Sequence, residues 1–280
     1  PPNRQAMKPP YTITPLILRC VSSISEKIGQ VNAGTFRRPP ASWRKRNALL
    51  KVHASLRLEG NKMSLRQIKA VLEQKQIKAD PLEMLEAQHA LKVYDELSLM
   101  DPFSLKDFLK THKMLMNGLE ELPGKFRNRE VGIVHGDNVA HIAPPAKKLT
   151  YLMQDLFRYL KDSEDPMLIK SCVFFYETEF IHPFLDGNGR LGRLWCGLLL
   201  SRINSLFMYI PLEQYLLESR HDYYKALAIS DSKGASTAFV EYLLQKIEQA
   251  LNDFLQERRV LSKNNHIYEE HKKNEESQKA

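Results

Sequence analysis

The chain has 280 residues, of which 43% are hydrophobic and 26% charged, and its formal net charge is +8. This length and composition are those of a globular protein with one large domain or two small ones, whose core needs no disulfide or metal to hold it. No apolar run reaches membrane-spanning length, and the first residues lack the regions of a signal peptide. We therefore expect a cytoplasmic protein with no membrane partner.

Part of the positive charge is local. Five basic residues gather within ten positions, namely Arg37, Arg38, Arg44, Lys45 and Arg46. A basic patch can bind nucleic acid. Because no helix-turn-helix or zinc-finger pattern accompanies it, we favour a solvated or anion-attracting surface and expect no nucleic acid partner.

The first part of the chain shows the patterns of one helix after another. Thr14 with Pro15 supplies an N-cap and a first-turn proline, and Ser64 with Gln67 forms a capping box. Apolar residues at helical spacing extend these signals. We expect helices from Thr14 to Gly29, from Ser42 to about Leu58, from Ser64 onward, from Asp80 to Leu99 and from Ser104 through Leu119.

The pattern changes after residue 125. Short apolar runs flank Gly136-Asp137-Asn138, and Pro144-Pro145 closes the segment, which predicts a β-hairpin. Helical spacing then returns to the end of the core. We expect helices over residues 149–160, from Asp165 to just before His182, from Leu191 to Ile203, from Pro211 to Leu227 and from Ser236 to Leu255.

The expected fold is therefore all-α, a helical bundle with one β-hairpin. Residues 1–62 would supply N-terminal helices and residues 63–256 the core. Residues 257–280 form a polar tail that is either a frayed helix or disordered. Because a two-stranded hairpin is marginal by itself, we expect it to rest on a surface or to act as a clamp.

The segment from His182 to Arg193, HPFLDGNGRLGR, gathers several chemically useful groups. Its glycines precede a helix whose free N–H groups and positive end can bind an anion. Arg190 and Arg193 lie three residues apart near that end, which suits a polyphosphate. Asp186 could hold Mg²⁺ beside the phosphates. A neutral His182 could accept a proton from a hydroxyl group.

Each of these residues also has a plainer interpretation. Asp186 and the Gly-Asn-Gly run could form a turn, the two arginines could pair on the surface, and Asn188 could brace the loop instead of bonding a phosphate. Phe184 is expected to be a core residue that anchors the loop. Chance assembly of the whole pattern is roughly below one in a million per position at ordinary residue usage. The combination therefore favours a site that holds and breaks a nucleoside triphosphate.

The segment resembles the signature of the Fic family, HxFx(D/E)GNGRxxR, at every fixed position, and the resemblance covers about Tyr11 to Leu255. Members of that family are helical and mostly transfer AMP from ATP to a protein hydroxyl with Mg²⁺, releasing pyrophosphate. The resemblance implies His182 as general base, Asp186 as Mg²⁺ ligand and Arg193 as contact to the γ-phosphate. It assigns the remaining phosphate contacts to Gly187, Asn188, Gly189 and Arg190. Gly189 also differs from the lysine of the Doc branch, which phosphorylates instead.

An earlier segment, from Ser55 to Gly60, resembles the inhibitory pattern (S/T)xxxE(G/N) of the same family. The resemblance implies that Glu59 carries a carboxylate to the position of the γ-phosphate and pairs with Arg193. The chain would then be autoinhibited. By spacing alone, Glu59 could instead simply end its helix and bond nearby.

Two further segments resemble parts of the family fold. The 126–145 hairpin is similar to the flap that aligns a target protein segment by strand pairing. The segment from Pro211, PLEQYLLESRHDYYKAL, resembles the helix near the adenine pocket, with Tyr223 and Tyr224 as candidate contacts. Helical surfaces near the inhibitory segment could also pair in a homo-oligomer.

Three functions remain open from the sequence. The leading one is an autoinhibited protein adenylyltransferase that acts on a Ser, Thr or Tyr hydroxyl. The same site could instead remove AMP or transfer another nucleotide or phosphate-bearing group, which the mass added to a target would reveal. The third is a nucleotide-sensing regulator that binds DNA. Its expected C-terminal winged helix is not visible after Leu255, and DNA retention at high salt would support it.

Overall fold

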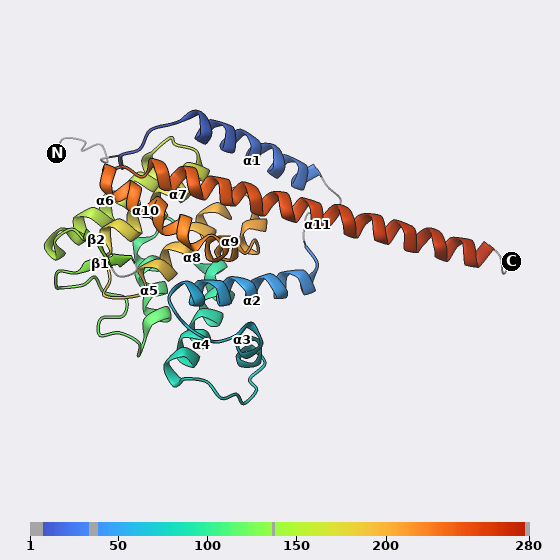
Figure 1. The fold of residues 1–280 in the computed structure, drawn as a ribbon, viewed down its shortest axis with the longest axis horizontal. Helices are drawn as coiled ribbons and strands as arrows, with labels where there is room; N and C mark the ends of the chain where they lie inside the picture. Colours follow the sequence, from blue (N-terminus) through green and yellow to red (C-terminus); the bar gives the residue numbers. More distant parts are fainter. Residues whose placement is uncertain (1–7, 34–38, 136–137, 278–280) are drawn as a thin grey trace.

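The computed structural model describes residues 8–33, 39–135 and 138–277, and the side chains of residues 8–33, 39–132 and 143–259. Within these ranges the chain is a helical body with one pair of strands (Figure 1). Arg37 and Arg38 of the basic patch, and Gly136 and Asp137 of the predicted hairpin turn, lie outside the described residues.

The elements follow in chain order. The helices are α1 (Pro15–Ala33), α2 (Ala41–Leu58), α3 (Leu65–Leu72), α4 (Pro81–Glu96), α5 (Leu105–Met116), α6 (Leu149–Asp162), α7 (Met167–Ile181), α8 (Asn188–Leu200), α9 (Leu212–Glu218), α10 (Arg220–Lys233) and α11 (Thr237–Ser277). The strands are β1 (Gly132–His135) and β2 (Asn138–Ile142), and short 3₁₀ turns are η1 (Leu97–Leu99), η2 (Ala146–Lys148) and η3 (Ser205–Met208).

Helices α7 and α8 pack together at the centre of the body, and the predicted site loop joins them (Figure 1). Every residue of α8 is buried, as its apolar sequence on all sides requires. Phe175 of α7 comes so close to Gly192 of α8 that a Cβ added there would lie 2.8 Å from the ring. This tight contact fixes the two helix ends that flank the loop.

A second hydrophobic cluster joins α2 to α3 and α4. Its buried members are Val52, Leu56, Met63, Ile68, Ala87 and Ala90. They come from both sides of residue 62, where the sequence suggested a domain boundary. The N-terminal helix α2 is therefore packed against elements assigned to the core.

Helix α2 also turns a polar stripe toward the body. Asn47, Lys51 and Ser55 are buried and spaced by four residues, so they share one face. The Lys51 ammonium donates to the Met208 carbonyl at 3.2 Å. Glu59, the C-cap residue that follows α2, occupies the next position of this stripe. The stripe therefore directs Glu59 toward α8.

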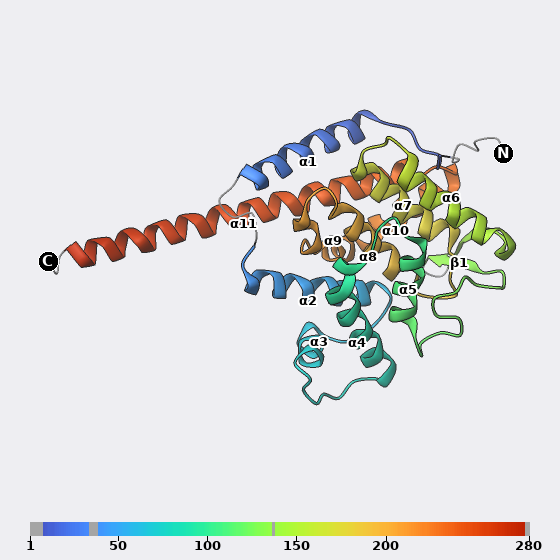
Figure 2. The same ribbon diagram turned by 180° about the vertical axis from the view of Figure 1, so that it is seen from behind.

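Helix α11 lies alongside α1 and then extends beyond the body (Figures 1 and 2). The sequence placed the end of this helix near Leu255 and left residues 257–280 as a frayed or disordered tail. The helix instead continues without interruption to Ser277. The segment contains no glycine or proline, so nothing in its sequence forces a stop.

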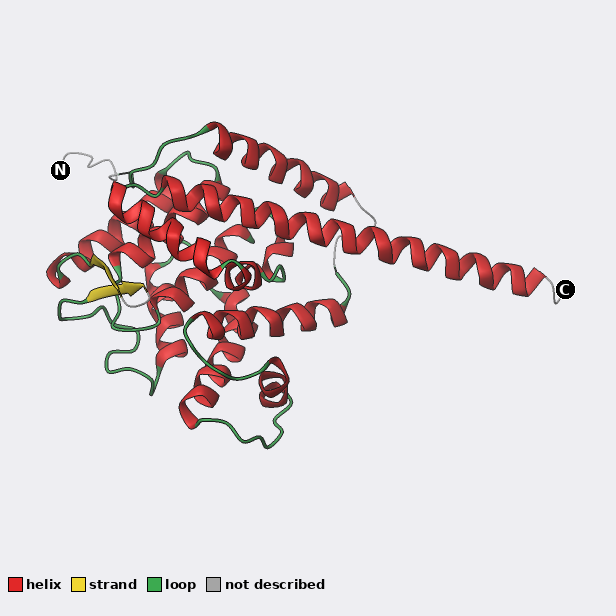
Figure 3. Cartoon of the chain, viewed as in Figure 1, coloured by secondary structure: helices red, strands yellow, loops and turns green. Residues whose placement is uncertain are grey.

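Strands β1 and β2 pair in antiparallel fashion near one end of the body (Figure 3). Gly132 lies opposite Ile142, and the register shifts between Ile133 and Val134. The paired residues occupy only the middle of the predicted 126–145 segment. Their use as a docking flap stays a prediction.

Several predicted helix limits differ from the structure. Helix α4 ends at Glu96 and not at Leu99, and α8 runs from Asn188 to Leu200 and not from Leu191 to Ile203. Helix α1 continues past Gly29 to Ala33, because Val31 is still buried against the core. Helix α5 ends at Met116, before Leu119. The helix predicted over 211–227 is divided at Ser219, whose hydroxyl donates to the Tyr215 carbonyl at 2.7 Å. A serine that bonds the backbone in this way competes with helical hydrogen bonding.

Candidate active site

His182 ends α7 in a left-handed conformation, with φ at +49°. Its Nδ1 lies 3.3 Å from the Glu179 carbonyl oxygen. Because a carbonyl oxygen only accepts, this contact places the proton on Nδ1 and leaves a lone pair on Nε2. Burial lowers the pKa of His182 to about 4. The ring is therefore neutral near pH 7 and can accept a proton.

A buried arginine, Arg127, fixes the chain around His182. Its Nε donates to the His182 carbonyl at 2.8 Å, and its main-chain N–H donates to the Pro183 carbonyl at 2.9 Å. Its Nη atoms donate to the carbonyls of Arg129 and Pro144, which lie before and after the hairpin. One side chain therefore ties the C-terminus of α7, where a cation is favoured, to the base of the hairpin.

The sequence predicts an anion site at the start of α8. Gly187 is the N-cap, with φ at +82°. The side chain of Asn188 is used within the loop, because it accepts from the Phe184 N–H and donates to the Phe184 carbonyl, both at 3.0 Å. Here Asn188 braces the loop. The N–H groups of the first helical turn have no carbonyl partner within the helix and can face an anion.

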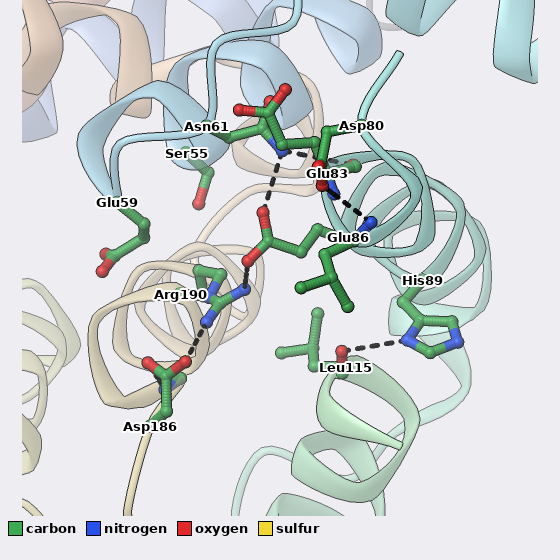
Figure 4. A network of polar contacts seen from close by, with 12 residues as sticks. Ser55, Glu59, Asn61, Asp80, Glu83, Glu86, His89, Leu115, Asp186 and Arg190 are labelled. Carbon is green, nitrogen blue, oxygen red and sulfur yellow. Dashed lines mark hydrogen bonds and ion pairs between the residues drawn. The ribbon is translucent and has the colours of Figure 1, made fainter. Parts of the chain in front are cut away.

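Figure 4 shows a chain of polar contacts that runs from the end of α2 to the loop. Asn61 Nδ2 donates to Glu86 Oε2 at 2.8 Å, and Glu86 Oε1 accepts from Arg190 Nη1 at 2.8 Å. Arg190 Nη2 donates in turn to Asp186 Oδ2 at 2.9 Å. The Asp186 side chain is 57% exposed, whereas that of Arg190 is 5% exposed. Asp186 thus faces solvent, and Arg190 is held below it between two carboxylates.

Arg193 is bound by the end of α2. Its Nη2 donates to Glu59 Oε1 at 2.6 Å and to the Ser55 carbonyl at 3.1 Å, and its Nε donates to Ser55 Oγ at 3.1 Å. The Arg193 side chain is 2% exposed and that of Glu59 29%. Burial disfavours the charge of Arg193, but Glu59 and the neighbouring acidic groups outweigh it, so the pKa of Arg193 is raised. The contact expected between Glu59 and Arg193 is therefore present.

The two candidate tyrosines lie beside this pair. Tyr223 is buried, and its hydroxyl donates to Glu179 Oε1 at 3.0 Å. Tyr224 is half-buried, and its hydroxyl donates to the Leu58 carbonyl at 3.4 Å. Tyr223 is thus part of the packed wall of the site. Tyr224 is the more accessible of the two.

A buried histidine supports the loop from below. His112 Nδ1 accepts from the Gly124 N–H at 2.9 Å, so Nε2 carries the proton and donates to the Asp186 carbonyl at 2.9 Å. The His112 ring stacks on Phe184, with 3.6 Å between centroids. Burial lowers the pKa of His112 to about 4, which keeps the ring neutral. Phe184 is fully buried, as expected of the loop anchor.

Three separate stretches of sequence therefore meet at one place: residues 55–59, 182–193 and 223–224. Sequence analysis missed four residues that hold them: Glu86, His112, Arg127 and Glu179. Glu179 left a signal, as a carboxylate in a largely apolar helix that leads to His182. His112 could also be placed, because it shares the apolar face of α5 with Phe108 and Leu115. Glu86 and Arg127 come from polar stretches in which burial cannot be read from spacing.

Comparison with known proteins identifies the family. Residues 102–200 match the Fic/DOC family. A crystal structure of a Fic family protein from Desulfovibrio desulfuricans G20 is 37% identical, with a TM-score of 0.86, over 90% of this chain and 78% of that one. The chain belongs to the Fic family. The structure of Fic-1 from C. elegans, 22% identical with a TM-score of 0.72, covers 88% of this chain and 73% of that one, and shares the fold.

Curated relatives include proteins named protein adenylyltransferase Fic. That of Drosophila melanogaster is 29% identical and that of Drosophila yakuba 28% identical, each over 215 residues. The match covers 73% of this chain but 41% of each relative's length. Across residues 8–33, 39–135 and 138–277, every helix falls short of the length or the apolarity that crossing a membrane demands.

Proposed function

We propose that this chain is an autoinhibited protein adenylyltransferase, which transfers AMP from ATP to a Ser, Thr or Tyr hydroxyl of a target protein and releases pyrophosphate. Two observations carry the proposal: a neutral His182 lies in the loop that leads to the N-terminus of α8, and Glu59 is hydrogen-bonded to Arg193. Proteins named adenylyltransferases among the relatives support it.

In the proposed reaction the target oxygen forms a bond to the α-phosphorus of ATP. The bond between the α-phosphorus and the oxygen bridging to the β-phosphate breaks, and its electron pair leaves with pyrophosphate. Nε2 of His182 takes the proton of the hydroxyl. The Glu179 carbonyl keeps Nε2 free for this role by holding the Nδ1 proton.

The residues of the loop fit a magnesium triphosphate. Asp186 offers a carboxylate that is more than half exposed, a ligand suited to Mg²⁺. When bound, the ion would neutralise charge on the phosphates. Gly189 has no Cβ at the first turn of α8, and the Glu59 carboxylate occupies the space beside it: a Cβ there would lie 2.7 Å from Glu59 Oε1 and 3.0 Å from Arg193 Nη1. Arg193 can meet a terminal phosphate in that space once Glu59 has moved away.

The proposed inhibition follows from the pairing of Glu59 with Arg193. A phosphate must displace the Glu59 carboxylate from a guanidinium that is almost fully buried. Breaking a buried ion pair from one side costs about 3–5 kcal/mol, and the partial exposure of Glu59 places this pair toward the lower end. A triphosphate bound without that contact would be misaligned for attack at its α-phosphorus, and misalignment lowers the rate steeply.

We further propose that a target segment docks beside the 126–145 hairpin by strand pairing. Arg127 supports this role, because it links the segments flanking both strands to the carbonyl of His182. A segment paired with the hairpin would therefore be held in register with the catalytic base.

The direct test follows label from ATP into protein, using the Glu59→Gly variant and a cell lysate. We expect label from the α-phosphate to enter protein and label from the γ-phosphate not to. His182→Ala in the same background should abolish labelling. His89→Ala should retain it, because His89 bonds the Leu115 carbonyl away from the loop. Transfer of γ-label would show phosphorylation instead, and absence of any label would overturn the proposal.

A further inference from the structure

The Glu179 side chain lies beside the space proposed for the γ-phosphate, and the proposed function gives it no role. A Cβ added to Gly189 would lie 2.7 Å from Glu59 Oε1, 3.0 Å from Arg193 Nη1 and 3.1 Å from Glu179 Oε1. Two carboxylates and one guanidinium therefore converge on the same small space. Glu59 bonds Arg193, whereas Glu179 accepts from Tyr223 at 3.0 Å.

The charged and titratable groups that face Glu179 come from three directions. They are Glu59 after α2, Arg193 of α8, and Tyr223 and Asp231 of α10. Burial and then Glu59 raise the pKa of Glu179 to about 7, against the opposing effects of Arg193 and Tyr223. With one guanidinium between two acids, only one acid needs to be ionised to balance the charge.

We propose that Glu179 controls how a nucleoside triphosphate fits this site: when Glu59 withdraws, Glu179 remains beside Arg193, and the γ-phosphate binds fully only when Glu179 takes up a proton. This inference rests on the proposed function, because it assumes that the γ-phosphate replaces the Glu59 carboxylate at Arg193. A phosphate placed there faces Glu179 as Glu59 does now, and like charges so close favour protonation. A nucleoside diphosphate has no group in that space and requires no such proton.

Because a proton is taken up when the triphosphate binds, its affinity should depend on pH. Withdrawal of Glu59 removes one of the groups that raise the pKa of Glu179. In protein that lacks both the Glu59 contact and a nucleotide, Glu179 is therefore ionised more often. Binding of the γ-phosphate raises this pKa again. The triphosphate should therefore bind more weakly as the pH rises, by up to roughly tenfold per pH unit for one linked proton.

The test measures binding without turnover. The Glu59→Gly, His182→Ala protein is titrated with Mg·ATP and Mg·ADP by calorimetry from about pH 6 to pH 8, and compared with the same protein carrying Glu179→Gln. Glutamine keeps an acceptor for the Tyr223 hydroxyl and removes the charge. We expect ATP affinity to fall roughly tenfold more over this range with Glu179 than with glutamine, and ADP affinity to show no such difference. Ionisation of the γ-phosphate itself acts alike in both proteins.

Buffers of different ionisation enthalpy count the protons directly. Uptake on ATP binding should be greater with Glu179 than with glutamine. Tyr223→Phe removes a donor that stabilises the ionised Glu179, so the fall in ATP affinity should move to higher pH. Two results would overturn this inference but leave the proposed function standing. One is an ATP affinity with the same pH dependence in both proteins, and the other is an ADP affinity that depends on Glu179 as much as the ATP affinity does. Failure of every variant to bind either nucleotide would overturn the proposed function as well.

Discussion

The chemistry proposed for the loop depends on the protonation of His182. Its pKa is lowered to about 4 by burial, so the basic form exists throughout the range above that value. Between about pH 7 and pH 5.5 we expect no loss of the neutral ring, whereas an ordinary histidine with a pKa near 6.5 would lose most of it. An NMR titration of the His182 ring checks this directly. A midpoint near 6.5 would contradict the burial that the structure shows.

Glu86 is the residue outside the signature whose removal should be most revealing. It holds Arg190 at 2.8 Å, and Arg190 also holds Asp186. In the Glu59→Gly background, Glu86→Gln would leave Asp186 as the only charged partner of Arg190 in this chain of contacts. Arg190 would then bind the Asp186 carboxylate more strongly and compete with Mg²⁺ for it. The Mg²⁺ concentration needed for half-maximal labelling should rise several-fold.

Glu83→Gln provides the matched control on the same helix. Glu83 accepts from the Lys62 N–H and makes no ion pair with Arg190 among the described contacts. Its Mg²⁺ requirement should equal that of the Glu59→Gly background. If Glu86→Gln and Glu83→Gln behave alike, Arg190 does not compete for Asp186.

Among the elements, the pairing of α7 with α8 is the contact most sensitive to added volume. Gly192→Ala would place a methyl group 2.8 Å from the Phe175 ring, and we expect a loss of about 1–3 kcal/mol in the free energy of unfolding. Gly29→Ala lies within α1 with nothing nearby, so it should instead gain about 0.5–1 kcal/mol from helix propensity. Denaturant unfolding of both variants measures the difference. Equal effects would show that α7 and α8 are not closely packed at Gly192.

Local signals explain why many helix starts could be predicted from the sequence. The capping box of Ser64 and Gln67 is present with both of its hydrogen bonds. The sequence suggests a second box at Asp80 and Glu83. Asp80 does cap α4, but Glu83 bonds the Lys62 N–H and does not complete the box. At the break, Ser219 bonds the Tyr215 carbonyl and also contacts the Tyr242 hydroxyl, and the second contact cannot be read from local sequence. Capped starts such as those of α3 and α4 can be predicted from neighbours in sequence, whereas the end of α1 depends on packing.

The residues of the site also fall into those that the sequence predicts and those that only the structure reveals. The residues from His182 to Arg193 are contiguous, so their shared position was predictable from the sequence. Glu59 could be placed only through the resemblance, since its contact with Arg193 spans 134 positions. Glu86 and Arg127 could not be predicted, because a charged residue in a polar segment gives no sign that it is half-buried, as Glu86 is, or buried, as Arg127 is.

At the scale of the whole molecule, Glu59 should couple stability to ligand binding. Glu59→Gly leaves Arg193 without its closest carboxylate and should cost about 1–3 kcal/mol, which lowers the Tm by a few degrees. It should also open the site, so that excess Mg·ATP raises the Tm of the variant more than that of the wild-type protein. Thermal unfolding with and without Mg·ATP measures both changes. Equal stabilisation of the two proteins would show that Glu59 does not exclude the nucleotide.

The most direct test of the central claim is the initial rate at which α-label from ATP enters protein, measured for the wild type and for Glu59→Gly under the same conditions. If Glu59 occupies the γ-phosphate contact of Arg193, the variant should be faster by about a hundredfold, the rate equivalent of roughly 3 kcal/mol. Equal rates for the two proteins would contradict the claim.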